Sequence, residues 1–475
     1  MKLGQWIVTT GAALAALLWL CGAAVKAQDE PEGTERKTAF KLYRWQEDYS
    51  YLAGKELSDW ERLKYIRIAE WSGAWLSLGG EVRYRLDGYD RYLFGLGRSG
   101  YAWASSQERI FQHVDLHWSL FRAFVQVDAA AEDGRPVQRA FDRSSPDLRN
   151  GFLDLILPAG DGRLTLRGGR QELWLGPSRW LAVRDPTNLR RSFDGALAEY
   201  DDAALTLRGF TARPVDIMEG LFDDATLGAE RFRGGYLTLK SPFGLPGTLD
   251  LYGYAKQQDS VSYRRGTASE DRWTAGLRLA LKAHGFEMAA EAARQGGSFG
   301  AASIDAVGGF ADLGQRLKPF ALGDATPVTP KLGLRGHYAS GDSNLNDGRF
   351  RTFVAAYPAA SVVSEMSLVS VSNLINLQPY LQLFVGPTLT LGASWNVLRK
   401  ATAADSVYGP TGTLITAKNS SSLDVARIAQ LDMVWDASKF LQLHALYSHV
   451  YAGGYVVAAG GRDFDYYRLQ LMARW

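Results

Sequence analysis

Arginine and tryptophan are concentrated in residues 169–195, which carry five arginines and two tryptophans. A guanidinium group is a planar fork that matches a carboxylate with two parallel hydrogen bonds, whereas an ammonium acts as a point charge. An indole ring nearby can stack on a pyranose ring. The stretch therefore indicates binding of a carboxylated sugar, and the alternative is a loop that only packs on its neighbours. The polar candidates in it are Arg170, Arg184, Arg190, Arg191 and Asp194.

A second group of residues could hold a metal ion. Its members, spaced as the first, third, fifth and sixth positions of a short loop, are Asp342, Asn344, Asn346 and Asp347. Oxygen ligands at this spacing are typical of calcium loops, but the glycine and the glutamate of an EF-hand are absent. We expect no cofactor and read the loop as an ordinary Asx-turn, with calcium in this external loop as the alternative.

Catalysis has little support in the sequence. Gly341-Asp342-Ser343 is similar to a short esterase motif, and a nucleophilic serine needs a base within hydrogen-bonding reach. Of the six histidines only His337 is near in sequence, and nothing marks it as the partner. A hydrolase is the remote alternative, and we expect no enzyme.

Apolar and polar residues alternate through most of the chain. Between residues 76 and 87 the apolar residues are Leu76, Leu78, Val82, Tyr84 and Leu86, and the same parity pattern ends the chain at Trp475. Side chains of a strand point alternately to opposite faces, so these segments are strands with one apolar and one wet side. No apolar run after residue 27 approaches the roughly 18–20 residues of a membrane helix. We predict an all-β transmembrane antiparallel β-barrel, with a soluble sandwich or solenoid as the alternative.

The connections between strands support the barrel. We predict about eighteen strands, from 75–87 to 463–475. The long connections are 88–106, 131–149, 172–194, 213–230, 341–365 and 400–423. Most of the others are tight turns, although 315–330 is long and 296–300 is short. Long extracellular loops that alternate with short periplasmic turns are typical of outer-membrane barrels. Aromatic girdles are expected from Trp75, Trp118, Trp273, Trp395, Trp435 and Trp475.

The N-terminus reads as a secretory signal. Lys2, an apolar stretch over 7–20 and small residues ending at Ala27 predict a signal peptide over 1–27. Residues 28–73 are charged, aromatic and not alternating, so we predict a periplasmic or lumen-side plug, and 74–475 forms the barrel. The only cysteine, Cys21, falls in the leader, so the mature chain has no disulfide.

Charge excludes one class of function. Loss of Lys2 and Lys26 with the leader leaves 51 basic residues against 51 acidic ones. A net charge of zero argues against a nucleic-acid binder that relies on bulk positive charge.

The polar side chains on the wet side of each strand would line a water-filled lumen. It contributes Arg83, Arg85, Arg167, Arg278 and Arg335, which join the polar residues of 169–195 as the predicted substrate path. Acidic residues such as Glu81 and Asp87 share these positions. The arginines therefore either bind a carboxylated solute or pair with acids across the lumen to make the barrel rigid.

Several motifs resemble the alginate-export family of outer-membrane barrels. They are Gly169-Arg170-Gln171, the segment Asn188–Gly195, Ala339–Asp342 with Asn344, Asn346 and Asp347, the segment Tyr43–Tyr49 and the strand Leu78–Arg83. The resemblance covers essentially the whole mature chain. It implies an eighteen-stranded barrel whose arginine-rich constriction conducts a polyuronate, although the lumen of this chain is mixed in charge rather than dominantly basic.

The sequence thus predicts an outer-membrane channel of a Gram-negative bacterium for an anionic polysaccharide such as alginate, or its oligomers. A general or small-anion-selective porin on the same barrel is the alternative. The expected partners are outer-membrane lipids, the saccharide and periplasmic export or uptake components, with no nucleic acid.

Overall fold

The computed structural model describes residues 40–69, 72–96, 101–177, 179–323, 326–359, 361–409, 414–417 and 420–475. The predicted signal peptide and residues 28–39 lie outside this part of the chain. The wall strands are β2 (Ala74–Tyr89), β3 (Trp103–Trp118), β4 (Phe121–Asp133), β5 (Ser144–Ala159), β6 (Gly162–Gln171), β7 (Phe193–Asp201), β8 (Leu205–Asp216), β10 (Glu230–Lys240), β11 (Gly247–Tyr263), β12 (Gly266–Ala283), β13 (Phe286–Phe299), β14 (Ala302–Arg316), β16 (Thr326–Ala339), β18 (Leu374–Val385), β19 (Leu389–Arg399), β22 (Asp424–Asp436), β23 (Leu441–Ala452) and β24 (Phe464–Arg474).

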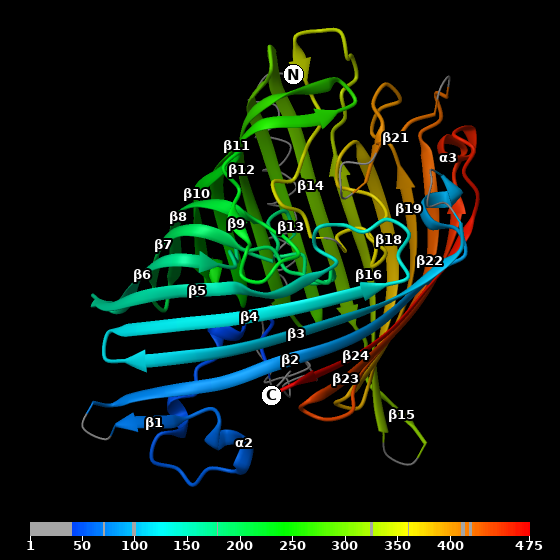
Figure 1. Cartoon of the computed structure of the whole chain (residues 1–475). Coiled ribbons are helices and arrows are strands. Elements are labelled where there is room, and N and C mark those ends of the chain that lie inside the picture. Colours follow the sequence, from blue (N-terminus) through cyan, green and yellow to red (C-terminus); the bar gives the residue numbers. More distant parts are fainter. Residues whose placement is uncertain are drawn as a thin grey trace.

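These eighteen strands form one closed antiparallel barrel (Figure 1). Each wall strand pairs with the next one along the chain, and the barrel closes where β2 pairs with β24, from Glu81 opposite Arg474 to Tyr89 opposite Tyr466. Closure removes the exposed edges that an open sheet would leave. The predicted fold and strand number are confirmed. Several predicted boundaries were wrong by five residues or more, and the largest error is at β18, which begins at Leu374 and not at 366.

The two ends of the barrel differ. We call the end with the short connections the turn end and the other the loop end. Both exceptions noted in the sequence have a structural cause: the small strand β15 (Phe320–Leu322) pairs with β16 at the turn end, and β13 and β14 extend into a tight hairpin at the loop end. The other small elements are β1 (Ile66–Ala69), β9 (Ala225–Thr226), β17 (Arg349–Phe350), β20 (Val407–Tyr408), β21 (Leu414–Ile415), α2 (Asp59–Arg62), α3 (Gly454–Ala458), η1 (Arg44–Gln46), η2 (Ser50–Leu52), η3 (Tyr92–Gly95) and η4 (Pro242–Gly244).

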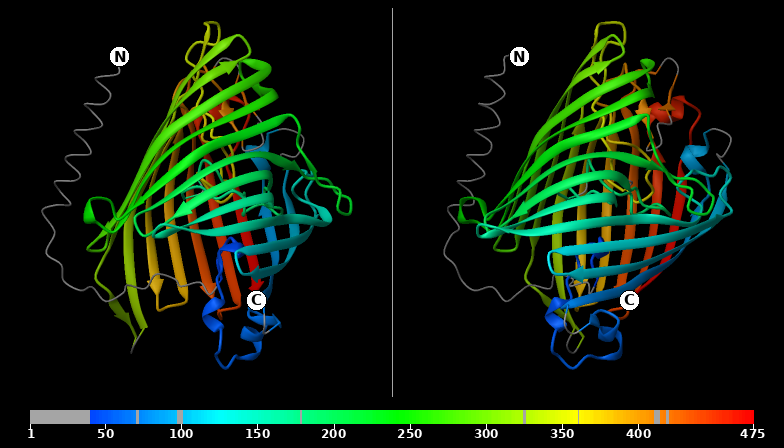
Figure 2. Two further views of the ribbon diagram at one scale, coloured as in Figure 1. Left: turned by 90° about the vertical axis from the view of Figure 1, so that its left-hand side faces the viewer. Right: turned by 60° about the vertical axis from the view of Figure 1, so that its left-hand side comes forward.

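Residues 40–69 lie at the turn end, on the same side as the C-terminus (Figure 2). The Arg44 guanidinium donates to the backbone oxygens of Gly80 and Trp475, at 2.9 and 2.8 Å, and so ties this segment to the seam between β2 and β24. Trp75 was predicted to belong to an outer girdle, and this was wrong. It lies on the inward parity of β2, where it is buried against this segment and stacks on His117.

Among the described residues no helix has the length and apolar character needed to cross a membrane.

Candidate functional site

The alternation read from the sequence separates the two faces of the wall. On β2 the apolar side chains point outward, and Tyr84 is 42 % exposed, whereas Arg83 on the other parity is 2 % exposed. The outward face also carries Trp118, Trp273, Trp395 and Trp435, all exposed. The polar parity therefore lines the interior, as expected for an outer-membrane barrel.

The connection between β6 and β7, residues 172–192, folds into the barrel and not outward. Trp180, Leu181 and Leu189 are buried in it. The side-chain amide of Asn188 donates to the backbone oxygens of Glu108, Ala131 and Asp142, at 2.8–3.1 Å, and so anchors the loop to the wall. Its apolar side chains are thereby removed from water inside the barrel. We call residues 172–192 the first inward loop.

Asp185 in the first inward loop is the centre of an arginine cluster. Its Oδ1 accepts hydrogen bonds from Arg190 Nε at 2.6 Å and from Arg109 Nη2 at 3.1 Å. Arg83 donates to the backbone oxygens of Asp185 and Thr187, at 2.9 and 2.7 Å. Burial disfavours the carboxylate, but the attraction of Arg190, Arg109 and Arg83 outweighs it and holds the pKa of Asp185 well below its usual range.

Four other predicted lumenal arginines are paired with acids. Each contacts an acid on its own or a neighbouring strand at 2.7–3.1 Å: Arg85 with Asp87, Arg167 with Asp154, Arg278 with Asp250 and Arg335 with Asp312. Partners one strand apart hold one another rigidly, and their charges cancel locally. For these four residues the pairing role proposed from the sequence is the one that the structure shows.

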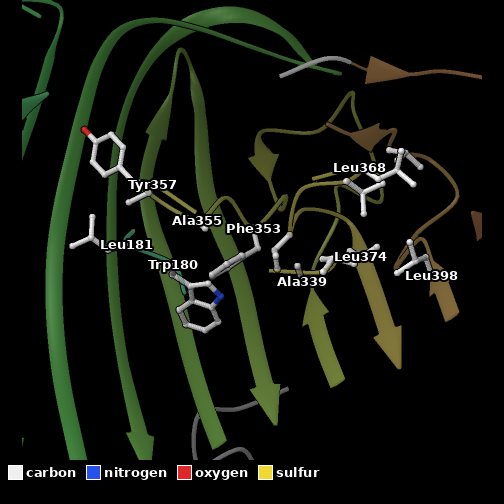
Figure 3. Close-up of a cluster of buried hydrophobic side chains, with 14 of the residues drawn as sticks. Trp180, Leu181, Ala339, Phe353, Ala355, Tyr357, Leu368, Leu374 and Leu398 are labelled. Carbon is white, nitrogen blue, oxygen red and sulfur yellow. The ribbon is translucent and has the colours of Figure 1, made fainter. Parts of the chain in front are cut away.

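A second inward loop, residues 340–373 between β16 and β18, meets the first across the barrel. Ala182 N donates to Tyr357 O at 2.8 Å, and Tyr357 N donates to Trp180 O at 3.1 Å. Around this contact Trp180, Phe353 and Leu368 belong to a buried hydrophobic cluster inside the barrel (Figure 3). The two loops thus constrict the lumen with an apolar brace, which the sequence did not predict.

On the loop-end side of this brace lies a cavity of about 350 Å³ lined by Arg184, Arg191, Lys256, Glu230 and Tyr357. Lys256 lies 3.4 Å from the Glu230 carboxylate, and Tyr357 donates to that carboxylate at 3.0 Å. Within the described part of the chain, neither Arg184 nor Arg191 makes an ion pair; they lie over the rings of Phe141 and Tyr357. Burial lowers the pKa of Arg191 to about 10, so it still carries its charge at neutral pH.

The backbone holds Arg184 at this cavity. Its φ is 60°, in the left-handed region that non-glycine residues adopt at a cost. Two hydrogen bonds from Thr187, through its N–H at 2.9 Å and its hydroxyl at 2.8 Å, fix the Arg184 carbonyl in a tight turn. Strain retained in a buried loop is common at binding sites.

Arg170 and Asp194 were predicted to line the lumen, and this was wrong. They pair with each other at 2.8 Å across β6 and β7, on the parity opposite to Arg167 and to the fully buried Phe193. Arg170 is three residues from Arg167, so the two side chains must point to opposite faces. Both lie on the outer wall near the loop end.

The predicted calcium residues form a self-contained network. Asp342 lies 2.8 Å from Arg265 and 3.5 Å from Arg351, and Asp347 lies 2.7 Å from Arg351. The oxygens of Asp342 and Asn344 also accept backbone N–H groups two residues on, as in Asx-turns. Two guanidinium groups occupy the positions from which a cation would be bound. The carboxylate oxygens therefore suit the two arginines better than calcium, because a calcium ion would have to displace both guanidinium groups.

Among the interior residues missed from the sequence are Arg109, Asp185 and Lys256, which belong to the arginine cluster and to the cavity. Arg109 and Lys256 could have been found from the sequence, because each lies at a polar position in the alternating pattern of a predicted strand. Asp185 had no such signal, because its role depends on how a loop folds into the barrel.

An apolar outer face, a charged interior and a closed sheet define this protein as a transport barrel of the Gram-negative outer membrane. The alginate export family matches residues 74–470, and the chain belongs to this family. The resemblance read from the motifs is thereby confirmed.

Two solved structures from Pseudomonas aeruginosa are similar to this chain in fold. OccK2 (OpdF) in complex with glucuronate is 13 % identical, with a TM-score of 0.53 and coverage of 84 % of this chain and 97 % of that one. OpdK with vanillate is 10 % identical, with a TM-score of 0.53 and coverage of 84 % and 98 %. At such identities the likeness establishes the fold alone. No curated protein matches the chain.

Proposed function

We propose that this channel conducts carboxylated saccharides, alginate or its oligomers, past arginines that bind each uronate weakly and repeatedly. Conduction requires sites that attract the solute but release it again. The family to which the chain belongs supports a polyuronate as the solute. Catalysis and a bound cofactor are not part of the proposal.

One observation carries it: Arg184 and Arg191 face the 350 Å³ cavity beside the constriction, and neither makes an ion pair with an acid among the described residues. Most other arginines of the interior have their charge matched by an acid. A buried guanidinium without a carboxylate is costly, and a uronate that enters the cavity would supply that carboxylate. Tyr357 offers an aromatic face beside Arg191, 4.7 Å from the guanidinium carbon to the ring centroid, on which a sugar ring can lie.

A small-anion porin is the second candidate. The pairing of Arg85, Arg167, Arg278 and Arg335 with acids favours it, because a lumen neutralised at most positions has a weak field for a long polyanion. The two candidates differ in whether successive sugar units are bound, which a chain-length series of solutes separates. OccK2, which shares the fold, binds glucuronate, but uronate binding by this chain rests on its own arginines.

Residues 40–69 belong to the proposed path. Arg190 Nη1 donates to Leu42 O at 2.9 Å, and the guanidinium of Arg167 lies 4.4 Å from the centroid of Trp45. This segment thus contacts the arginine cluster from the turn end. We propose that it narrows the periplasmic entrance and is the contact point for periplasmic export or uptake components.

The test is block of single-channel current in planar bilayers by oligomannuronate and by neutral mannose oligomers of equal length. We expect the charged oligomer to block the native channel at lower concentration, and the doubly substituted Arg184→Gln, Arg191→Gln channel to lose this difference. The matched control is Arg278→Gln with Asp250→Asn, which removes a compensated pair. Equal block of the native channel by both oligomers would refute the proposal.

A further inference from the structure

Three arginines on the outer wall face away from the lumen. Arg213 lies on β8, and Arg231 and Arg233 lie on β10. Phe232, between the last two, is 1 % exposed on the inner face, whereas Arg231 and Arg233 are exposed. Phe232 is in register with Ala212, and Arg233 with Thr211, so Arg213 and Arg231 end up as neighbours on adjacent strands.

These side chains surround a recess of about 410 Å³, which we call the rim recess. Its lining includes Asp194, Thr211, Arg213, Arg231, Arg233 and Gln257. Asp194 is already engaged, since it accepts hydrogen bonds from Arg170 at 2.8 Å and from Thr226 at 2.6 Å. The charge of Asp194 is therefore balanced by Arg170, and the recess is left with the three positive charges of Arg213, Arg231 and Arg233.

The three arginines have no acidic partner within the described residues, and this sets them apart from most of those inside the barrel. The contrast is sharp with Arg294 on β13, another exposed arginine of the outer wall, which lies 3.0 Å from Asp305. The only carboxylate in the lining, Asp194, is already paired with Arg170, so the three guanidinium groups repel one another. The arrangement therefore indicates a site for an anion that the chain itself does not supply.

Strand register gives the depth of the rim recess in the membrane. Leu207, Leu237 and Leu251 form an apolar row across β8, β10 and β11. Arg233 lies four residues nearer the loop end than Leu237, which is about 13 Å along the strand. In register with Arg233 are Ala255 and then the exposed Trp273, an aromatic of the kind that marks the membrane interface.

An outward arginine is tolerated at this depth. The free-energy cost of placing its charge against lipid is highest at the bilayer centre and small near the interface. The loop end faces the outside of the cell, so the recess opens at the headgroups of the outer leaflet. Three forked donors within one recess suit a phosphate, whose oxygens accept bidentate hydrogen bonds. Thr211 and Gln257 add neutral polar atoms suited to sugar hydroxyls.

We propose that the rim recess binds a phosphate group of a phosphorylated glycolipid of the outer leaflet, that is, of lipopolysaccharide. The lipid is held against the outer face of the wall formed by β8, β10 and β11. The lumenal arginines lie on the inner face of the barrel wall and do not contact it. This site is independent of the solute that the channel conducts.

The experiment titrates the purified, detergent-solubilised barrel with lipid A and measures binding by native mass spectrometry. Three arms identify the source of the phosphate: bisphosphorylated lipid A, the same lipid after removal of both phosphates, and inorganic phosphate alone. We expect saturable binding of one bisphosphorylated lipid A, at least tenfold weaker binding of the dephosphorylated lipid, and no retention of inorganic phosphate. Equal binding of the two lipids by the native protein overturns the proposal, as does retention of inorganic phosphate with the same affinity.

The variant is Arg213→Gln with Arg231→Gln and Arg233→Gln, and the matched control is Arg294→Gln, which removes an exposed but paired arginine of the same outer wall. We expect at least a tenfold loss of lipid A affinity in the triple variant and native affinity in the control. Native affinity in the triple variant, or an equal loss in the control, contradicts the assignment of these residues. The lipid comparison on the native protein decides the proposal even if the triple variant fails to fold.

Discussion

Asp185→Asn should make the channel more anion-selective. The carboxylate of Asp185 balances Arg190 and Arg109 at 2.6 and 3.1 Å, while its backbone oxygen holds Arg83. Asparagine keeps the shape and the backbone contacts but removes one negative charge. The constriction therefore gains one unit of positive charge without losing the loop that forms it.

The size of the effect follows from Coulomb's law. A unit charge roughly 7 Å from a permeating ion in a water-like medium changes the ion's free energy by about 0.6 kcal/mol. That favours an anion by about 2.7-fold and disfavours a cation equally, so the chloride-to-potassium permeability ratio should rise by up to about sevenfold. Screening should abolish most of the change at 1 M salt, where the Debye length is about 3 Å.

Reversal potentials in planar bilayers under a potassium chloride gradient measure this ratio. The matched control is Asp194→Asn, which makes the same change in net charge on the outer wall, beside Arg170. We expect a shift for Asp185→Asn at low salt and none for Asp194→Asn. An unchanged reversal potential for Asp185→Asn, or an equal shift in both variants, would show that Asp185 does not face the path of the ions.

Three further outcomes are expected. Arg44→Ala removes two hydrogen bonds to the seam between β2 and β24, and charge-assisted hydrogen bonds of this kind contribute about 1.5–3 kcal/mol each. Limited proteolysis should then cut residues 40–69 several-fold faster. An unchanged rate of cleavage would contradict the anchoring role of Arg44. Trp180→Ala should destabilise the contact between the inward loops by about 3–5 kcal/mol. Single-channel currents should then be larger and noisier, while the barrel stays resistant to detergent. Current noise equal to that of the native channel would argue against the brace. The loop 217–224 docks on β5, where Ser145 N donates to Glu219 O at 3.2 Å and Phe222 N donates to Pro146 O at 3.1 Å. Burial raises the pKa of Asp224 in this loop to about 6, so docking favours its protonated form and should be strongest below about pH 4 and weaken as the pH rises through 6. Hydrogen exchange of the loop should show this dependence, and Asp224→Asn should remove it.

The wall of the barrel could be predicted from the sequence, because the pattern that specifies each strand lies within that strand. Alternation along β2 or β24 assigns each side chain to a face without knowledge of any other strand. The same rule exposes the errors: Arg170 and Trp75 were placed on the wrong face although their parity relative to Arg167 and Ser77 was visible.

The constriction could not be predicted, because it depends on contacts between distant segments. Trp180 and Tyr357 carry no local sign that their loops hydrogen-bond inside the barrel. Met366, Leu368 and Val369 continue an apolar pattern, but they are buried in the lumenal cluster and not in a strand, which is why β18 was predicted to start too early. Whether an arginine is paired or free also depends on register between strands, which alternation does not supply.

The junction of the first and last wall strands has a consequence for biogenesis. Asp87 on β2 is buried inside the barrel, and besides Arg85 its partners are Arg468 at 3.1 Å and the Tyr466 hydroxyl at 2.7 Å, both on β24. Until the C-terminal strand arrives, this early carboxylate lacks two of these three partners. Chains truncated before β24 should therefore stall as open, protease-sensitive intermediates, because the barrel cannot close without this strand.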